Sequence, residues 1–287
     1  MRTLIARLRR TDPRHFQIFA LAVLLSYGIG MLQLDIDPLQ AIAILFTSLL
    51  VQYIGNRLTS DRAYDPRSAL ISSGSLILLL RTTSLETAVA AALLAVGSKF
   101  VIRFRGRHIV NPTNFGIVMV LLLFNDAWVS PGLWGSVALT GAALMFIGFL
   151  VVQRAERSDI TFAFLCSYAA ILFGRALWYG DPMAIPLHQM QSGTLLIFAF
   201  FMISDPKTTP DARPARILYA VALAAAAAWG RFALYEPTAV LYALIFLSPV
   251  VPVLNIYFPG KRYEWPGRSD GAGLKQSPPV MSASTAA

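Results

Sequence analysis

The sequence predicts an all-α integral membrane protein with ten transmembrane helices, arranged as a 5+5 inverted repeat. Of its 287 residues, 56% are hydrophobic and only 14% are charged, whereas about a quarter of the residues in a soluble protein are charged. Ten apolar runs recur along the chain, and two short motifs repeat between its halves. With a single cysteine as well, this composition excludes an ordinary soluble enzyme, a disordered chain and a disulfide scaffold.

The apolar runs are the candidate membrane spans, because a helix needs about 20 mostly apolar residues to cross a bilayer. They are rich in Ala and Leu and lack two-residue alternation, which favours helices over the strands of a barrel. In order, the runs are Phe16–Gln33, Leu39–Ile54, Ser68–Leu80, Leu85–Ile102, Asn114–Phe124, Leu133–Val152, Ile160–Tyr179, Met190–Ser204, Ile217–Leu234 and Thr238–Phe258. We expect a cytoplasmic N-terminal segment (1–15), a ten-helix membrane domain (16–258) and a disordered cytoplasmic tail (259–287).

Lysine and arginine orient these spans, because cytoplasmic loops retain positive charge during membrane insertion. With the N-terminus inside, 21 of the 24 basic residues fall in the N-terminal segment, the even-numbered connections and the tail. Only Arg81, Arg175 and Arg231 fall on the other side. The pattern predicts a multi-pass protein of the inner (plasma) membrane with both termini in the cytoplasm. It explains the net charge of +9 mainly as an orientation signal, together with attraction to the anionic lipid of the bilayer, and without a nucleic-acid partner.

Two motif pairs predict that the halves are inverted copies. In the short third and eighth runs, Ser73-Gly74-Ser75 matches Ser192-Gly193-Thr194, and Asn111-Pro112-Thr113 before the fifth run matches Glu236-Pro237-Thr238 before the tenth. Halves with an odd number of spans must lie upside down relative to each other. Paired short, Gly-interrupted helices in such repeats indicate a binding site at the membrane midplane. We therefore expect broken helices three and eight. The alternative is that Ser-Gly merely allows close helix packing.

The distribution of polar residues narrows the chemistry. All 15 Asp and Glu residues lie in loops or near span ends, which argues against a proton-coupled carrier, because such carriers place acidic residues inside the membrane. No His, Cys and carboxylate cluster has the spacing of metal ligands, and no nucleotide-binding or nucleophile motif is present. We therefore predict no metal site and no independent catalytic motif.

Two cytoplasmic junctions form the second candidate site. The first carries Lys99, Asn111 and Asn114, and the second carries Asp205, Lys207, Thr208 and Thr209. Asn-Pro and Asp-Pro begin helices, so a capping role is one interpretation. The group of Lys and Thr is also suited to a phosphate or flavin head group.

These junctions resemble the membrane subunits of the NqrB/RnfD family, from sodium-translocating NADH:quinone reductase and the Rnf electron-transport complex. The matching stretches are Arg67–Leu80, Gly97–Gly116 and Ser192–Pro210 with its Ser-Asp-Pro-Lys-Thr-Thr-Pro. The resemblance implies a ten-helix inverted repeat like that of urea channels, flavin-dependent electron transport, and other redox-complex subunits as partners. It implies a flavin, FMN or riboflavin, near Lys99, Asn111, Asn114, Asp205, Lys207, Thr208 and Thr209, with Ser73, Gly74, Ser192, Gly193 and Thr194 at the central site.

The chain departs from the family in one loop. Relatives with covalent FMN carry a Ser-Gly-Ala-Thr-like sequence before the eighth span, whereas this chain has no Thr between Gly180 and Gly193. We therefore expect noncovalent flavin and no covalent FMN, in a short and divergent relative. Two alternatives remain open from the sequence: a transporter or channel for a small solute, serving a natural-product biosynthesis pathway, and an assembly scaffold.

Overall fold

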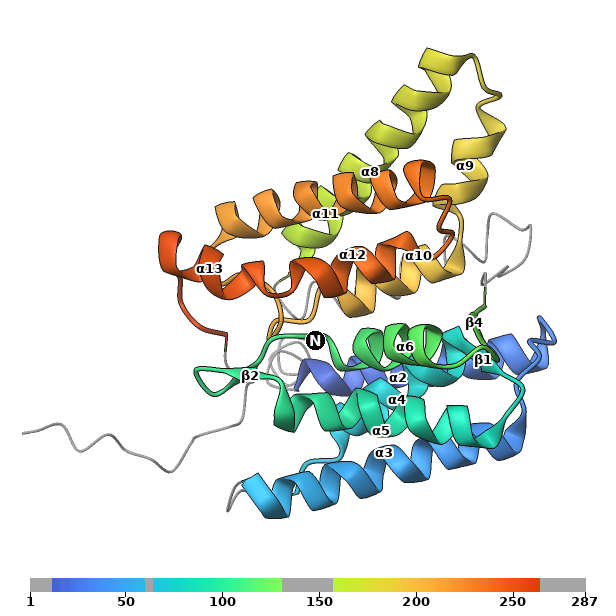
Figure 1. Ribbon diagram of the computed structural model, residues 1–287, viewed down its shortest axis with the longest axis vertical. Helices are drawn as coiled ribbons and strands as arrows, with labels where there is room; N and C mark the ends of the chain where they lie inside the picture. Colours follow the sequence, from blue (N-terminus) through green and yellow to red (C-terminus); the bar gives the residue numbers. More distant parts are fainter. Residues whose placement is uncertain (1–11, 60–63, 131–156, 264–287) are drawn as a thin grey trace, which may run out of the picture.

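The computed structural model describes residues 12–59, 64–130 and 157–263 and shows two helical halves lying side by side (Figure 1). The first half contains α2 (Pro13–Gly30), α3 (Pro38–Thr59), α4 (Arg67–Leu79), β1 (Leu80–Thr82), α5 (Leu85–Val101), β2 (Arg103–Phe104), β3 (Arg107–His108), α6 (Pro112–Leu123) and β4 (Ala127–Val129). The second half contains α8 (Ser158–Tyr179), α9 (Ala184–Met190), α10 (Gly193–Ile197), the π-helix η1 (Phe198–Met202), α11 (Arg213–Ala233), α12 (Ala239–Leu247) and α13 (Val250–Tyr257).

Nine of the ten predicted apolar runs coincide with helices, and the sixth, Leu133–Val152, lies outside the described residues. Within the described ranges, α3, α8 and α11 are long and apolar enough to cross a membrane. The pair α12 and α13, bent by 52°, would make a fourth span. The prediction of a helical membrane protein is therefore confirmed. Ten spans in a 5+5 inverted repeat remain a prediction.

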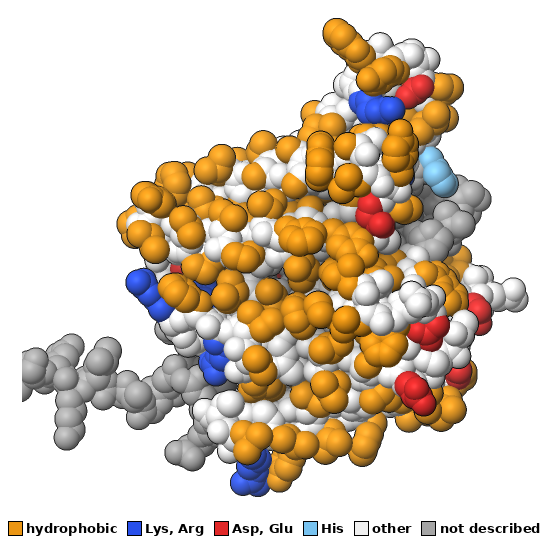
Figure 2. All heavy atoms as spheres, viewed as in Figure 1, with side chains coloured by type: hydrophobic (Ala, Val, Ile, Leu, Met, Phe, Trp, Pro, Cys, Tyr) orange, Lys and Arg blue, Asp and Glu red, His pale blue; other side chains and the backbone are white. Residues whose placement is uncertain are grey.

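The surface has the character of a protein embedded in lipid. Large apolar side chains such as Phe46, Leu177 and Phe246 are about two-thirds exposed or more, and apolar atoms cover most of the face seen in Figure 2. A soluble monomer rarely exposes a contiguous apolar area of this extent, because contact with water would oppose it.

Local sequence explains where the short helices begin. Asn111 caps α6 by accepting a hydrogen bond from the amide of Asn114 (3.0 Å), and Pro112 follows at the first helical position. In the second half, the Glu236 carboxylate accepts from the amide of Thr238 (2.9 Å), immediately before α12. Both Pro-Thr motifs therefore begin helices, as the sequence predicts, and α6 contacts α12 where the two halves meet.

The two Ser-Gly motifs differ in local structure. Ser192 is the N-cap of α10, so the chain is interrupted there after α9. Ser73 and Gly74 lie in the interior of the unbroken helix α4. The expected break at the first motif is wrong, because the Ser73 hydroxyl hydrogen-bonds the Leu70 carbonyl (3.1 Å) within the helix and Gly74 packs beside Leu21. The helix is short instead because β1 follows it and pairs with β4.

Basic side chains gather toward one end of the helices. On the face shown in Figure 2, most blue Lys and Arg side chains lie toward the left end and most red carboxylates toward the right. The β2–β3 hairpin marks the basic end in Figure 1, and the β1–β4 pair marks the opposite end. The basic connections predicted to share one side therefore gather at one end of the fold, here called the basic end.

Candidate functional site

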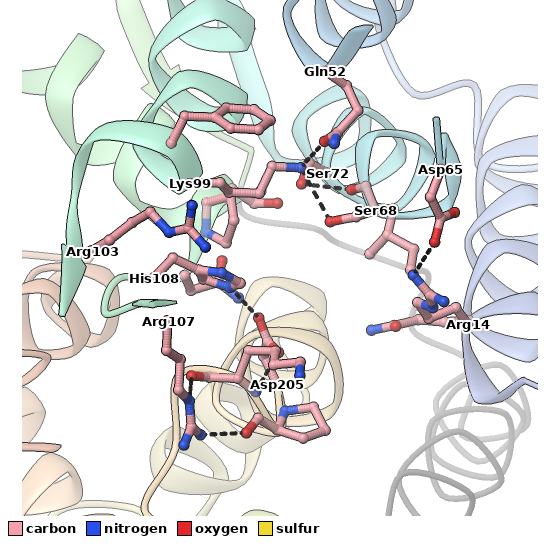
Figure 3. A pocket seen from close by; sticks show the side chains of 18 of the residues that line it. Arg14, Gln52, Asp65, Ser68, Ser72, Lys99, Arg103, Arg107, His108 and Asp205 are labelled. Carbon is pink, nitrogen blue, oxygen red and sulfur yellow. Dashed lines mark hydrogen bonds and ion pairs between the residues drawn. The ribbon is translucent and has the colours of Figure 1, made fainter. Parts of the chain in front are cut away.

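A cavity of about 570 Å³ lies at the basic end, where both halves contribute to its walls (Figure 3). Its size falls in the range of small-molecule sites, about 300–1,000 Å³. Its charged lining residues are Arg14, Asp65, Lys99, Arg103, Arg107, Asp205, Lys207 and Arg262. Six of these side chains are basic and two are acidic, so the cavity favours an anionic ligand.

Among the described residues that line this cavity, Lys99 is the most deeply placed basic residue to carry no carboxylate partner, with only 8% of the residue exposed. Its ammonium donates to the amide oxygen of Gln52 (2.6 Å) and to the hydroxyl of Ser68 (3.1 Å). No carboxylate among the described residues lies within ion-pair distance of it. A buried amino group held by neutral acceptors can pair with an anion, and an anion beside it would favour its charged form.

Two polar stripes, which the sequence reasoning missed, face the cavity beside Lys99. Gln52, Asn56 and Thr59 follow one face of α3, and Ser68, Ser72 and Ser75 follow one face of α4. Both sets have i, i+4, i+7 spacing, which places side chains on one side of a helix. A polar stripe at helical spacing within an apolar run was the signal available in the sequence.

An ion-pair network closes one wall of the cavity. Arg14 contacts Asp12 (2.6 Å) and Asp65 (2.8 Å), and Arg67 contacts the same two carboxylates at 2.8 Å each. Burial would raise the pKa of Asp65, but the hydrogen bonds from Arg67 and the charge of Arg14 lower that pKa to about 2. The two acids therefore neutralise two cations in this wall and leave the excess positive charge elsewhere.

Arg107 holds the loop after η1 in place. It donates to the backbone carbonyls of Pro206 (2.6 Å), Lys207 and Thr209 (2.8 Å), and it pairs with the Asp211 carboxylate at 2.8 Å. The Asp-Pro-Lys-Thr-Thr-Pro segment is therefore fixed by a side chain of the opposite half. Arg107 therefore explains how this motif keeps its conformation. It was not among the site residues predicted from the sequence.

Asp205 and His108 lie next to each other in the cavity wall, with 3.9 Å between the carboxylate and the His108 ring nitrogen (Figure 3). The Asp205 carboxylate also accepts from the backbone amide of Lys207 (2.9 Å). Burial would raise the pKa of Asp205, but the neighbouring His108 and the Lys207 amide hold that pKa below its ordinary value. Asp205 is thus an anion that positions its own loop.

Asn111 and Asn114 join the two halves. The Asn111 amide donates to the carbonyl of Met202 (3.3 Å) and lines the cavity, whereas the Asn114 amide donates to the carbonyl of Leu241 (3.0 Å) inside the protein. Within the described part of the chain, the buried amide oxygen of Asn114 has no hydrogen-bond partner. Asn111 therefore reaches the cavity, and Asn114 is a buried contact between the halves.

The remaining predicted residues lie elsewhere. The hydroxyls of Thr208 and Thr209 donate to the Asp205 carbonyl (3.4 and 3.0 Å) and stabilise the loop instead of lining this cavity. Ser73, Gly74, Ser192, Gly193 and Thr194 do not line it either. Thr194 donates to the Ser130 carbonyl (2.6 Å), which follows β4 at the opposite end. The structure therefore brings together Lys99, Asn111, Asp205 and Lys207, and not the other eight residues.

Two aromatic side chains complete the cavity. Phe100 lies next to Lys99 in sequence, Phe201 comes from η1, and both line the cavity. A planar aromatic ligand packs favourably against such rings. The residues present therefore fit a molecule with an aromatic ring system and an anionic group, such as a flavin phosphate.

Comparison with known proteins identifies relatives of the second half. A model of the NQR2, RnfD, RnfE family matches residues 127–264. A protein of Psychromonas ingrahamii, named as one subunit of an ion-translocating oxidoreductase complex, is 27% identical over 142 residues, which are 49% of this chain and 41% of that protein. Proteins of the same name from Escherichia coli O81 and Citrobacter koseri are each 28% identical over 135 residues.

The match has definite limits along the sequence. The chain covers 34% to 41% of the length of these relatives. The stretch Ser192–Pro210 lies inside the family match, whereas Arg67–Leu80 and Gly97–Gly116 precede it. The resemblance predicted from the Ser-Asp-Pro-Lys-Thr-Thr-Pro motif is confirmed: residues 127–264 are similar to the NQR2, RnfD, RnfE family.

Proposed function

We propose that this chain is a membrane subunit of an electron-transport complex, and that it binds a flavin noncovalently in the cavity at the basic end. The observation that carries the proposal is the excess of cations around that cavity together with Phe100 and Phe201. This combination favours FMN over riboflavin, because riboflavin lacks the phosphate that the cations would hold.

The chain's residues divide the task of holding the flavin. Lys99 and Arg103 would hold the phosphate, since both line the cavity and neither is ion-paired to a carboxylate within the described ranges. Phe100 and Phe201 would flank the ring system, and Asn111 would offer its side-chain amide at the edge of the cavity. A bound flavin would supply the capacity to accept and release electrons.

The role in a complex rests on the relatives, which are named as subunits of an ion-translocating oxidoreductase complex. We propose that this chain likewise acts beside other redox subunits. The proposal includes an inner-membrane location, ten spans in a 5+5 inverted repeat, and both termini at the cytoplasmic face. The gathering of basic connections at one end of the fold supports that orientation.

Flavin binding by the purified full-length protein tests the proposal. We expect yellow protein whose flavin is released by acid and runs as FMN in chromatography. Lys99→Met should weaken FMN binding about tenfold or more, because it removes a charged hydrogen bond worth about 1.5–3 kcal/mol. Riboflavin binding should change little, since riboflavin has no phosphate for Lys99 to hold.

Lys261→Met is the matched control, because Lys261 is an exposed lysine near the same end that does not line the cavity. It should bind FMN like the wild type. Equal losses in the two variants, or protein that binds neither FMN nor riboflavin, would contradict the proposal. Fluorescence retained on a denaturing gel would contradict noncovalent attachment.

A further inference from the structure

A second cavity, of about 240 Å³, lies on the other side of the β2–β3 hairpin. Phe104 and Arg105 of the hairpin line it, as do Val251, Pro252 and Ile256 of α13. Arg103 and Gly106 of the same hairpin line the first cavity. The hairpin therefore contributes to two neighbouring cavities, which share Arg107, His108, Lys207 and Arg262, whereas Phe104, Arg105 and the α13 residues line only the second.

Part of the second cavity's lining is cationic. Arg105, Arg107, Lys207 and Arg262 line it, against the single carboxylate of Asp211. That carboxylate accepts two hydrogen bonds from Arg107, at 2.8 and 3.1 Å. Its charge is therefore balanced, and the remaining cations favour a further anion.

Another part of this lining is apolar. Val251 is buried, Pro252 and Ile256 lie beside it, and Phe104 closes the wall. Ile256 is 58% exposed, and the exposed side chains of Val253 and Tyr257 extend the apolar surface along α13. The cavity thus leads from a cationic pocket onto an apolar helix face that ends at the basic end.

The backbone at Arg105 is strained in order to place this residue at the hairpin tip. Its φ is +48°, and Gly106 follows with φ +77°. These two residues form the turn between β2 and β3, where Asn or Gly usually occupies the first position. An arginine there costs about 1 kcal/mol relative to glycine, which marks the position as a candidate for function.

We propose that this cavity binds an anionic phospholipid, with its phosphate at Arg105 and Arg262 and its acyl chains along α13. Cationic groups beside an apolar face at the end of membrane helices match the two parts of such a lipid. A free phosphate would use only the cations. FMN would leave the apolar face of α13 exposed, so neither molecule accounts for both sides of the cavity.

Native mass spectrometry of the full-length protein in detergent measures this binding. The probes are phosphatidylglycerol and phosphatidylcholine with identical acyl chains, and inorganic phosphate. Phosphatidylglycerol should bind more tightly than phosphatidylcholine. Arg105→Asn should weaken phosphatidylglycerol binding about fivefold, and adding Arg262→Gln should weaken it about thirtyfold in total, since each cation near the interface contributes about 1 kcal/mol.

The variants also separate binding from folding. Asparagine tolerates positive φ, so Arg105→Asn should unfold at the same temperature as the wild type or higher. Ile256→Ser should weaken phosphatidylglycerol binding while leaving FMN binding unchanged, and Lys261→Gln should change neither. Equal affinity for the two lipids would overturn the proposal. So would inorganic phosphate that protects the protein against heat as well as phosphatidylglycerol does. The comparison of the two lipids uses no flavin, so the proposal stands or fails independently of the proposed function.

Discussion

The guanidinium of Arg107 lies 2.8 Å from the carboxylate of Asp211, and this ion pair joins the β2–β3 hairpin to the loop before α11. Both side chains are largely buried, at 14% and 12% exposed. Arg107 also donates to three backbone carbonyls of the same loop. The pair therefore fixes a loop of the second half that lines both cavities.

Arg107→Gln should lower the free energy of unfolding by about 3 kcal/mol, because it leaves the buried Asp211 carboxylate without its partner. Arg107→Lys should recover only part of this loss, since an ammonium lacks the planar fork that reaches several acceptors. Thermal unfolding of the purified variants in detergent measures both. FMN binding should fall in parallel, because the Lys207 segment loses its position.

Arg175→Gln provides the comparison for Arg107. Arg175 pairs with Asp181 at 3.1 Å, but both side chains are more than a third exposed. An exposed pair contributes about 0–1 kcal/mol, so this variant should unfold close to the wild-type temperature. Equal destabilisation by the two substitutions would show that Arg107 has no special role.

Asn111 has two functions that substitution can separate. Its side-chain oxygen caps α6 by accepting from the Asn114 amide, and its side-chain NH₂ group donates to the carbonyl of Met202 in the other half. Asn111→Asp keeps the cap and loses the donor, whereas Asn111→Ala loses both. We expect Asn111→Ala to cost about 1 kcal/mol more than Asn111→Asp, which is the typical value of an N-cap.

Ser84→Ala is the matched control for the cap, because Ser84 caps α5 by accepting from the Thr87 amide (3.1 Å). It should cost about 1 kcal/mol and leave FMN binding unchanged. Asn111→Asp should weaken FMN binding, because Asn111 lines the cavity. Identical thermal shifts for Asn111→Asp and Asn111→Ala would contradict the capping role.

Asp65 makes stability depend on pH. Its pKa is about 2 in the folded protein, against about 3.9 in an unfolded chain. A carboxyl with a lowered pKa stabilises the fold above the unfolded value, and this contribution disappears as the pH falls through the folded value. Asp65→Asn should therefore cost about 2 kcal/mol at pH 7, and its difference from the wild type should shrink as the pH falls from about 5 and vanish below about pH 2.

The double variant Asp65→Asn with Arg67→Gln tests the source of this effect. Arg67 contacts Asp65 at 2.8 Å, so the two substitutions should be less than additive. Unfolding followed between about pH 5 and pH 2 gives the comparison. A cost of Asp65→Asn that stays constant over this range would contradict the lowered pKa.

Periodicity and capping explain how much of the fold was predictable. Apolar runs gave nine helix positions because burial in lipid requires uninterrupted apolar sequence, and Asn-Pro gave the start of α6 because Pro fits the first helical turn. The continuity of α4 through Ser73-Gly74 could not be read from sequence. Gly74 lies against Leu21, a residue far away in the chain, and local sequence does not encode this contact.

The candidate site was only partly predictable for a similar reason. Lys99, Asn111, Asp205 and Lys207 stand out as polar residues at span ends, and the cavity includes all four. Thr208 and Thr209 have the right chemistry for a phosphate, yet their hydroxyls turn inward to the Asp205 carbonyl. The conformation of this loop depends on Arg107 of the other half, which donates to the Thr209 carbonyl. The local sequence of the loop does not encode this long-range contact.

Close packing of α5 against α6 supplies the last prediction. A Cβ added to Gly116 would lie 2.6 Å from the Ala91 carbonyl and 2.7 Å from the Ala95 side chain. Gly116→Ala should therefore cost about 1–3 kcal/mol, because the backbones of the two helices must separate.

Gly97, which lies in α5, provides the comparison for Gly116 of α6. A Cβ added to Gly97 would meet no described atom within 4 Å. Gly97→Ala should stabilise the helix by up to about 1 kcal/mol, since alanine is the better helix former. Thermal unfolding should thus shift in opposite directions for the two variants, and a Gly116→Ala variant that unfolds at or above the wild-type temperature would contradict the close contact of α5 with α6 at Gly116.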